Sequence, residues 1–344
     1  MRTVSLQPSG HIFQVEDDET ILAAALRHGF VLPYGCKNGA CGSCKATLVA
    51  GEVDYGIYQV KALTDLEKTQ CKVLLCQAKP LADVTLEVRS VGTNKDIPVK
   101  TLPCRVQKLE KITADVAILH LKLPANERLQ FLAGQYIEFL LRDGSRRSFS
   151  MGNAPHDHEL IQLHVRHVPG GSFTDHVFGK MKERDILRME GPHGTFFLRE
   201  DTDKPVVFVA SGTGFAPIKA ILEHAFAKGI TRPMVLYWGG RRPQDLYLNE
   251  LPAKWASEHA NFRYVPVISE ALPEDAWSGR SGFVHRAVMQ DFPDLSAHQV
   301  YACGVPVMVD SARQDFTGKC ALPEDEFYAD SFTTQANLAA SSPR

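Results

Sequence analysis

The sequence lacks the features that mark secreted, membrane-spanning and nucleic-acid-binding proteins. No run approaches the roughly 18 apolar residues that a membrane helix needs. The N-terminal stretch "MRTVSLQPSGHIFQVEDDET" has no apolar core segment, so no signal peptide is expected. The formal net charge is only −2, which argues against nucleic-acid and anionic-membrane partners. Internal repeats are also lacking. These absences predict a soluble, cytoplasmic protein.

Length and patterning divide the 344 residues into three predicted domains, since one hydrophobic core rarely supports so long a chain. Residues 1–92 hold short strand-like runs around one helix-like segment at 20–28. The linker-like stretch "VGTNKDIPVKTLP" follows, and closely spaced strand-like runs in 100–201 then predict an antiparallel barrel or sandwich. From 202 to 335, apolar strands alternate with helical patterns, which predicts an α/β domain with a parallel sheet. The final "NLAASSPR" has the composition of a loose tail.

Cysteine spacing is the most specific signal in the chain. Eight cysteines without a signal peptide favour metal or redox chemistry over a disulfide framework. Cys36, Cys41 and Cys44 follow a C-x4-C-x2-C pattern and, with Cys76, match plant-type [2Fe–2S] ligation. Zinc is disfavoured because it usually takes paired C-x2-C knuckles, and only one is present. Cys76 is preferred over Cys71 as fourth ligand because it follows a strand-like run.

Two other stretches carry groups suited to an anionic ligand. In "RRSFSMGN", an extended strand would place Arg147 and Phe149 on one side and Ser148 and Ser150 on the other. In "PGGSFTDHVF", glycines and hydroxyls precede a helix-like run, which is a backbone suited to phosphate. A solvated strand edge and an ordinary helix cap are the simpler interpretations of these two stretches.

A strand, a glycine turn and a helix follow one another in "VVFVASGTGFAPIKAIL", which is a dinucleotide-binding arrangement. Pro217 replaces the third glycine of the usual fingerprint, and Arg241 and Arg242 stand where an acidic residue would end the next strand. "YACGVPVMV" then adds Cys303 after a further strand-like run. These departures disfavour an ordinary Rossmann dehydrogenase.

Taken with these motifs, the chain resembles the ferredoxin–NADP⁺ reductase superfamily in the form with an N-terminal plant-type ferredoxin domain, over nearly its whole length to about Phe332. Reductase components of phenol hydroxylase, methane monooxygenase and benzoate dioxygenase have this form. The segment "PSGHIFQVEDDETILAAALRHGFVLPYGCKNGACGSCK" is most similar to CDP-6-deoxy-Δ3,4-glucoseen reductases. The resemblance implies a β-grasp ferredoxin domain, an antiparallel β-barrel flavin domain and an α/β parallel-sheet NAD(P)-binding domain.

The resemblance also implies roles for residues. Arg147 would contact the pyrophosphate of FAD, Phe149 would stack on the isoalloxazine, and Ser150 would lie near N5. Cys303 would lie beside the nicotinamide, and Asp330 with Phe332 would close over the flavin. The implied catalytic residues are Ser150, Cys303 and Asp330. The implied cofactor-binding residues are Arg147, Ser148, Phe149, Ser150, Gly170, Gly171, Ser172, Phe173, Thr174, Gly212, Thr213, Gly214, Pro217, Arg241, Cys303, Gly304 and Phe332.

The expected function is electron transfer from NADH, with NADPH as the alternative, through FAD and a [2Fe–2S] cluster to an acceptor protein. "GGRRPQDLY" resembles the corresponding loop of NADH-using reductases and favours NADH. A CDP-hexose dehydrase and an oxygenase component are the two acceptors that the resemblance suggests. A redox sensor without turnover and a zinc-bearing interaction module are the alternatives of another class, and the intact glycine turn favours turnover.

Overall fold

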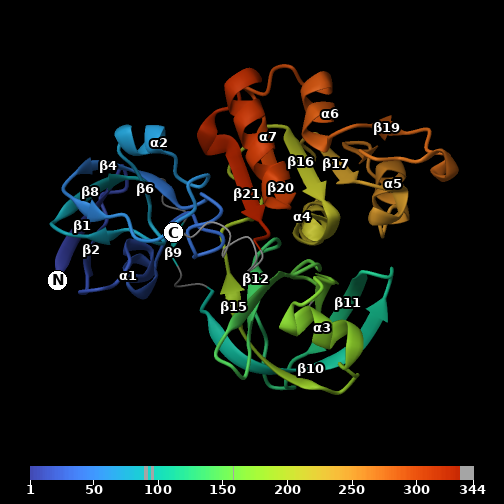
Figure 1. The fold of residues 1–344 in the computed structure, drawn as a ribbon, viewed down its shortest axis with the longest axis horizontal. Helices are drawn as coiled ribbons and strands as arrows, with labels where there is room; N and C mark the ends of the chain where they lie inside the picture. The colour runs from blue at the N-terminus through green and yellow to red at the C-terminus, as the bar shows by residue number, and fades with distance from the viewer. Residues whose placement is uncertain (89–91, 94–96, 158, 334–344) are drawn as a thin grey trace. The chain divides into compact units, whose positions relative to one another are not determined.

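The computed structural model describes residues 1–88, 92–93, 97–157 and 159–333, and Figure 1 shows the course of the chain. Part of the predicted linker and the whole of the predicted tail lie outside these residues. Contacts between Cα atoms group the chain into two compact units. The first holds Met1–Pro98, Gly194–Phe196 and the chain from Ala329 on, and the second holds Val99–His193 and Phe197–Tyr328.

The first sheet has five strands in the order β2-β1-β8-β4-β6 and belongs to the first unit (Figure 1). Only the β1–β8 pair is parallel. The predicted helix at 20–28 is confirmed, because α1 begins after Thr20, whose side chain accepts the N–H of Ala23. The elements are β1 Arg2–Gln7, β2 Ile12–Val15, α1 Ile21–Arg27, β3 Phe30–Val31, β4 Lys45–Ala50, β5 Val53–Asp54, α2 Asp65–Thr69, β6 Lys72–Leu74, β7 Lys79–Pro80, β8 Val84–Glu87 and β9 Gly92–Thr93.

The second sheet has six strands in the order β13-β12-β15-β10-β11-β14, and every pairing in it is antiparallel, as predicted. An isolated antiparallel bridge between Met151 and Leu163 joins the end of β13 to β14, the two outer strands of this order. Apolar side chains such as Phe139 fill its interior. The elements are β10 Lys100–Lys111, β11 Val116–Lys122, β12 Tyr136–Leu140, β13 Arg146–Ser150, β14 Ile161–Arg166, α3 Ser172–Gly179 and β15 Ile186–His193.

The third sheet has the order β19-β18-β17-β16-β20-β21, and its strands from β19 to β20 are parallel, as predicted. Residues 206–210 of β16 are almost inaccessible, as expected where helices cover both faces of a parallel sheet. The chain moves outward in both directions from β16, which creates a topological switch point beside it. The elements are β16 Val206–Ser211, η1 Gly212–Gly214, α4 Phe215–Ala227, β17 Met234–Gly240, η2 Pro243–Asp245, α5 Glu250–Glu258, β18 Phe262–Ile268, η3 Pro273–Asp275, β19 Arg280–Ser281, α6 Val284–Asp291, β20 Gln299–Gly304, α7 Pro306–Lys319, η4 Glu324–Glu326 and β21 Phe327–Ser331.

Helix length bears on the membrane prediction. Within the described ranges, no helix has both the length and the apolar composition that crossing a membrane requires.

Candidate functional site

The cysteine loop between β3 and β4 holds three of the four predicted ligands, and the fourth, Cys76, follows β6. Cys41, Cys44 and Cys76 are buried and Cys36 is half-buried, whereas Cys71 is exposed. The backbone N–H of Cys36 donates to Cys41 Sγ at 3.4 Å. The structure therefore groups Cys76 with the loop cysteines and leaves Cys71 at the surface.

Two glycines give this loop its shape. Gly39 and Gly42 have φ of 75° and 72°, a region that residues with a side chain rarely adopt. A Cβ atom on Gly39 would lie 2.8 Å from the carbonyl oxygen of Ile57, so the loop packs against the segment that follows β5.

The thiols titrate as two hydrogen-bonded pairs. The hydrogen bond from Cys36 lowers the pKa of Cys41 to about 5, and the same bond raises the pKa of Cys36. Cys44 and Cys76 form the second pair, in which the hydrogen bond raises the pKa of Cys44 and lowers that of Cys76. Two thiol pairs, on a backbone kept open by glycine, suit the ligation of a [2Fe–2S] cluster.

The two predicted flavin motifs meet in the second sheet. Arg147 on β13 directs Nη2 toward Ser172 Oγ at 3.5 Å, at the first residue of α3, and donates from Nη1 to the carbonyl of Arg146 at 2.8 Å. Gly170 has φ of 80°, and Gly171 is the N-cap of α3. An arginine beside a helix N-terminus suits a phosphate-bearing ligand.

Two aromatic residues of these motifs pack into the interior of the second sheet. The ring centroid of Phe173 lies 4.8 Å from that of Phe139 and 5.2 Å from that of Phe149. Phe173 is 3% exposed, so its side chain is committed to the core and its backbone is what remains for ligand contact. Phe149 is half-buried and keeps part of its ring accessible.

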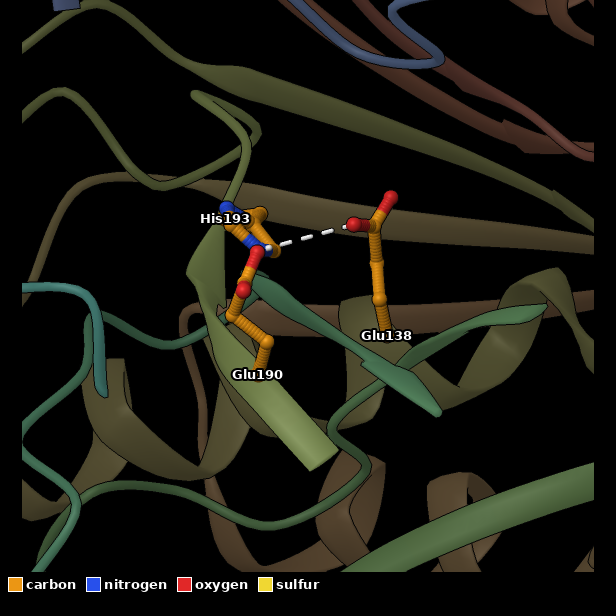
Figure 2. A group of neighbouring side chains, drawn as sticks. All are labelled: Glu138, Glu190 and His193. Atoms are coloured by element: carbon orange, nitrogen blue, oxygen red, sulfur yellow. Dashed lines mark ion pairs between the residues drawn. The ribbon is translucent and has the colours of Figure 1, made fainter. Parts of the chain in front are cut away.

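A charged cluster anchors the other face of β13. Figure 2 shows His193 and the carboxylates of Glu138 and Glu190 close together; His193 Nε2 lies 3.7 Å from Glu138 Oε2 and 3.3 Å from Glu190 Oε1. These side chains are of types that bind metals. Arg146 Nη1, however, lies 3.0 Å from Glu138 Oε2 and 2.6 Å from Glu190 Oε1. Since this guanidinium already pairs with both carboxylates, we assign the cluster to structural anchoring of β13.

The predicted nucleotide motifs meet at the switch point of the third sheet. The turn Gly212–Gly214 follows β16, and Cys303 and Gly304 end the neighbouring strand β20. A Cβ atom on Gly214 would collide with the carbonyl group of Cys303 and lie 2.7 Å from Gly304 Cα. Pro217 stands in the first turn of α4, where no backbone N–H is required. The close packing of these turns leaves a backbone-lined edge at the carboxyl ends of two parallel strands, where dinucleotides bind.

Sequence analysis missed Arg166, the last residue of β14. A Cβ atom on Gly212 would lie 2.9 Å from Arg166 Nη1, so this arginine of the second sheet reaches the glycine turn of the third. Its Nε and Nη2 atoms are buried and make no hydrogen bond within the described chain, although they face Asp115 Oδ2 at 3.0 Å and Asp245 Oδ1 at 3.6 Å. The available signal was its place in "LHVRHVPGG", directly before a glycine turn.

The two arginines after β17 differ in their surroundings. Arg242 binds Asp275 with two hydrogen bonds, from Nε at 2.6 Å and from Nη2 at 2.7 Å. The Arg241 side chain is 70% exposed. Asp245 accepts the backbone N–H of both, at 2.8 and 3.1 Å, and so fixes the loop.

Asp330 and Phe332 lie at the C-terminal end of the described chain. Asp330 is buried on β21, and Phe332 follows that strand, half-buried.

Comparison with known proteins agrees with this arrangement. Three family models match: a 2Fe-2S iron-sulfur cluster binding domain at residues 4–81, an oxidoreductase FAD-binding domain at 103–198 and an oxidoreductase NAD-binding domain at 208–314. The three matched ranges together cover more than half of the chain.

Relatives match over nearly their full length. The chain is 43% identical over 329 residues to CDP-6-deoxy-L-threo-D-glycero-4-hexulose-3-dehydrase reductase of Yersinia pestis, covering 96% of this chain and 98% of the relative. It is 36% identical over 347 residues to the reductase component of phenol 2-monooxygenase of Pseudomonas sp. strain CF600, covering 99% and 97%. The crystal structure of an Amycolatopsis cytochrome P450 reductase aligns with a TM-score of 0.77 and 34% identity, covering 97% and 99%. The chain therefore belongs to the iron–sulfur flavoprotein reductases, oxidoreductases that join a 2Fe–2S domain to FAD-binding and NAD-binding domains.

Proposed function

We propose that this reductase passes electrons from NADH through FAD and a [2Fe–2S] cluster to a separate acceptor protein, and that the acceptor is a dehydrase acting on a CDP-linked hexose. The observation that carries the acceptor assignment is the 43% identity, over 96% of the chain, to a protein named as the reductase of such a dehydrase. The alternative is an oxygenase component, and the 36% identical phenol 2-monooxygenase reductase component supports it.

FAD supplies the conversion between a two-electron hydride and single electrons, which neither nicotinamide nor the cluster provides. The work left to the chain is to bind and orient these groups. We take 1–92 as a β-grasp ferredoxin domain, 100–201 as a closed β-barrel and 202–335 as the nucleotide-binding domain. The Met151–Leu163 bridge supports barrel closure, and the three family matches lie within these bounds.

Cys36, Cys41, Cys44 and Cys76 are the proposed cluster ligands. Cys76→Ser should remove or severely destabilise the cluster, and Cys71→Ser, the matched control, should leave it intact because that thiol is exposed and outside the group. The visible spectrum of each variant decides this. If Cys71→Ser loses the cluster absorbance and Cys76→Ser keeps it, the choice of Cys76 as fourth ligand is overturned. Cluster loss should spare reduction of ferricyanide and abolish reduction of cytochrome c.

Arg147 is proposed to anchor the pyrophosphate of FAD with help from the amides of α3 and from Ser172, whose Oγ lies 3.5 Å from Arg147 Nη2. Ser148 belongs to the same strand, and Gly170, Gly171 and Thr174 shape the turn. Phe149 is proposed to stack on the isoalloxazine through the part of its ring that stays accessible. Loss of Arg147 should therefore lower flavin occupancy, read as the ratio of flavin to protein absorbance.

Ser150 and Cys303 are proposed to orient the flavin and the nicotinamide for hydride transfer. Both side chains are small, uncharged and buried, so they would orient the rings by steric contact rather than by charge. Ser150→Ala and Cys303→Ala should keep flavin and slow its reduction by NADH about tenfold or more. Unchanged stopped-flow rates in both would withdraw the assignment. Asp330 and Phe332 are proposed to close over the flavin, and removing both should raise the rate of flavin loss.

Nucleotide choice is proposed to favour NADH, with the turn Gly212–Gly214, Gly304 and Arg166 beside the pyrophosphate. Arg242 is already bound to Asp275, so it is a poor partner for a 2′-phosphate. Arg241 is the exposed cation of this loop.

The acceptor is tested by reconstitution. Purified reductase with NADH is mixed with a CDP-6-deoxyhexulose dehydrase and its sugar substrate, or with the oxygenase component of a phenol hydroxylase and phenol. Deoxygenated sugar formed only in the first mixture supports the proposal, and product only in the second overturns it in favour of the alternative. Ferricyanide reduction by NADH excludes a sensor without turnover.

A further inference from the structure

A buried hydrogen bond joins the second sheet to the third. Tyr247, just after η2, and His164, on β14, are 2.7 Å apart from the hydroxyl oxygen to Nδ1. The two side chains meet edge to face, with ring centroids 5.5 Å apart. They are 8% and 5% exposed, so water competes little for this bond. Tyr247 lies in the region of the NAD-binding family match and His164 in that of the FAD-binding match.

The neighbours of His164 settle how its protons are arranged. Its Nε2 lies 3.2 Å from Gln162 Oε1, which we assign as an acceptor, so Nε2 carries the proton. Nδ1 then accepts from the hydroxyl of Tyr247. Burial lowers the pKa of His164, assisted by the charges of Lys219 and His120, and burial raises the pKa of Tyr247. Both groups are therefore neutral near pH 7, as this hydrogen bond requires.

On the flavin side, His164 supports the turn that follows β13, the strand called the flavin strand here because it carries Arg147 and Ser150. A Cβ atom on Gly152 would lie 3.0 Å from His164 Nε2, and the N–H of Gly152 donates to the carbonyl of Gln162 at 2.7 Å. Gly152 lies two positions after Ser150. A shift of the imidazole would therefore displace Gly152 and, through it, the end of β13.

On the nucleotide side, Tyr247 packs on the rings that hold the glycine turn. Its ring centroid lies 5.3 Å from that of Trp238 at 89°. Trp238 donates from Nε1 to the carbonyl of Gly212 at 3.1 Å and stacks on Phe215, the first residue of α4, at 4.0 Å. The hydroxyl of Tyr247 thus binds His164 of the second sheet, while its ring supports the glycine turn of the third sheet.

We propose that His164 and Tyr247 are positioning residues that hold the end of the flavin strand and the nucleotide turn in register for hydride transfer. The proposal rests on the NADH-to-flavin step of the proposed function. A hydrogen bond is directional, so it fixes the orientation of the flavin strand relative to the nucleotide turn more tightly than ring contact does. A displacement of about 1 Å between reacting groups can cost about 100-fold in rate while binding is little changed.

The test is Tyr247→Phe, with Tyr264→Phe as its matched control. Tyr264 also donates from a largely buried hydroxyl, to Asn249 Oδ1 at 2.7 Å, but that bond stays within the nucleotide-binding domain. Stopped-flow bleaching of the flavin by NADH is followed in the holoenzyme without any acceptor. Tyr247→Phe should lower the limiting rate about tenfold with the half-saturating NADH concentration within about threefold, and should show a larger deuterium isotope effect with NADH deuterated at the transferred position. Tyr264→Phe should keep the wild-type rate.

A second variant shows whether the pair acts together. His164→Gln with Tyr247→Phe should be no slower than the slower single variant, because one interaction is lost only once. A wild-type rate in Tyr247→Phe, or an equal loss in Tyr264→Phe, would overturn the positioning role alone. If NADH does not reduce the flavin of the wild-type enzyme, the proposed function is overturned, and the positioning role with it. Failure of the acceptor assignment would leave the NADH-to-flavin step and the positioning role unaffected.

Discussion

Among single residues, His164 ties stability to pH. The unfolded chain binds a proton at this histidine below its ordinary pKa of 6.5, whereas burial holds the folded pKa well below that value. Below pH 6.5 the unfolded state therefore carries more protons, so folding weakens as pH falls, down to the folded pKa. The contribution is fully present above pH 6.5.

We expect His164→Gln to destabilise the protein less at pH 5 than at pH 7, by up to about 2 kcal/mol. His285 and His298 also have lowered pKa values because of burial, but they are present in both proteins and cancel. The melting temperatures of wild type and variant at the two pH values provide the measurement. A gap between them that is constant with pH would show that His164 takes up its proton in the folded state.

Arg242 is bound to Asp275, which makes its positive charge less available to a nucleotide phosphate. Hydrogen bonding to Arg242 holds the pKa of Asp275 below its usual range, so the pair stays ionised at neutral pH. We expect Asp275→Asn to release Arg242 and raise the ratio of kcat/KM for NADPH over NADH by about threefold or more. Arg241→Ala should lower that ratio. Steady-state kinetics with both nucleotides checks this, and an unchanged ratio in Asp275→Asn would remove Arg242 from nucleotide choice.

At the scale of elements, the junction of the turn after β16 with the end of β20 leaves no room for a side chain. A Cβ atom on Gly214 would meet backbone atoms of Cys303, which cannot rotate away. We expect Gly214→Ala to lower the melting temperature and to abolish NADH-driven flavin reduction. Gly318→Ala is the matched control, since nothing lies within 4 Å of the new methyl group in α7. That change should stabilise the helix by up to about 1 kcal/mol. A functional Gly214→Ala variant would show that β20 can move.

Most elements that position the site were predictable because their patterns are local. Apolar runs at 206–210 and 234–238 predicted strands of the parallel sheet, and Thr20 marked the start of α1. Cysteine spacing is likewise local, because three of the four proposed ligands lie in the one loop between β3 and β4. The role of Arg166 was not predictable, because only the packing of β14 brings it to Gly212. The packing of Phe173, which is among the predicted cofactor-binding residues, was not predictable either, since its ring completes a core that the sequence pattern does not reveal.

At the scale of the whole molecule, one chain carries the nucleotide-, flavin- and cluster-binding domains, so we expect transfer between them to be intramolecular. Linked modules meet at effective concentrations of about millimolar, far above those of separate proteins in solution. We expect the rate of cluster reduction by NADH to be independent of protein concentration, and transfer to the acceptor to depend on it. Stopped-flow traces at several enzyme concentrations measure both. A cluster reduction rate that rises with concentration would indicate transfer between molecules.

Lys219, on α4, is 7% exposed, and its ammonium group donates to the carbonyl of Gly152 at 2.8 Å and pairs with Glu223 at 2.8 Å. An amine-acylating reagent can reach this nitrogen only in molecules where α4 has moved away from Gly152. The rate of Lys219 acylation, followed by mass spectrometry, therefore measures how often α4 and Gly152 separate. The 69% exposed side chain of Lys254 serves as the internal reference. We expect NAD⁺ to slow the labelling of Lys219 and not that of Lys254. Equal labelling of the two lysines would mean that α4 and Gly152 are apart for most of the time.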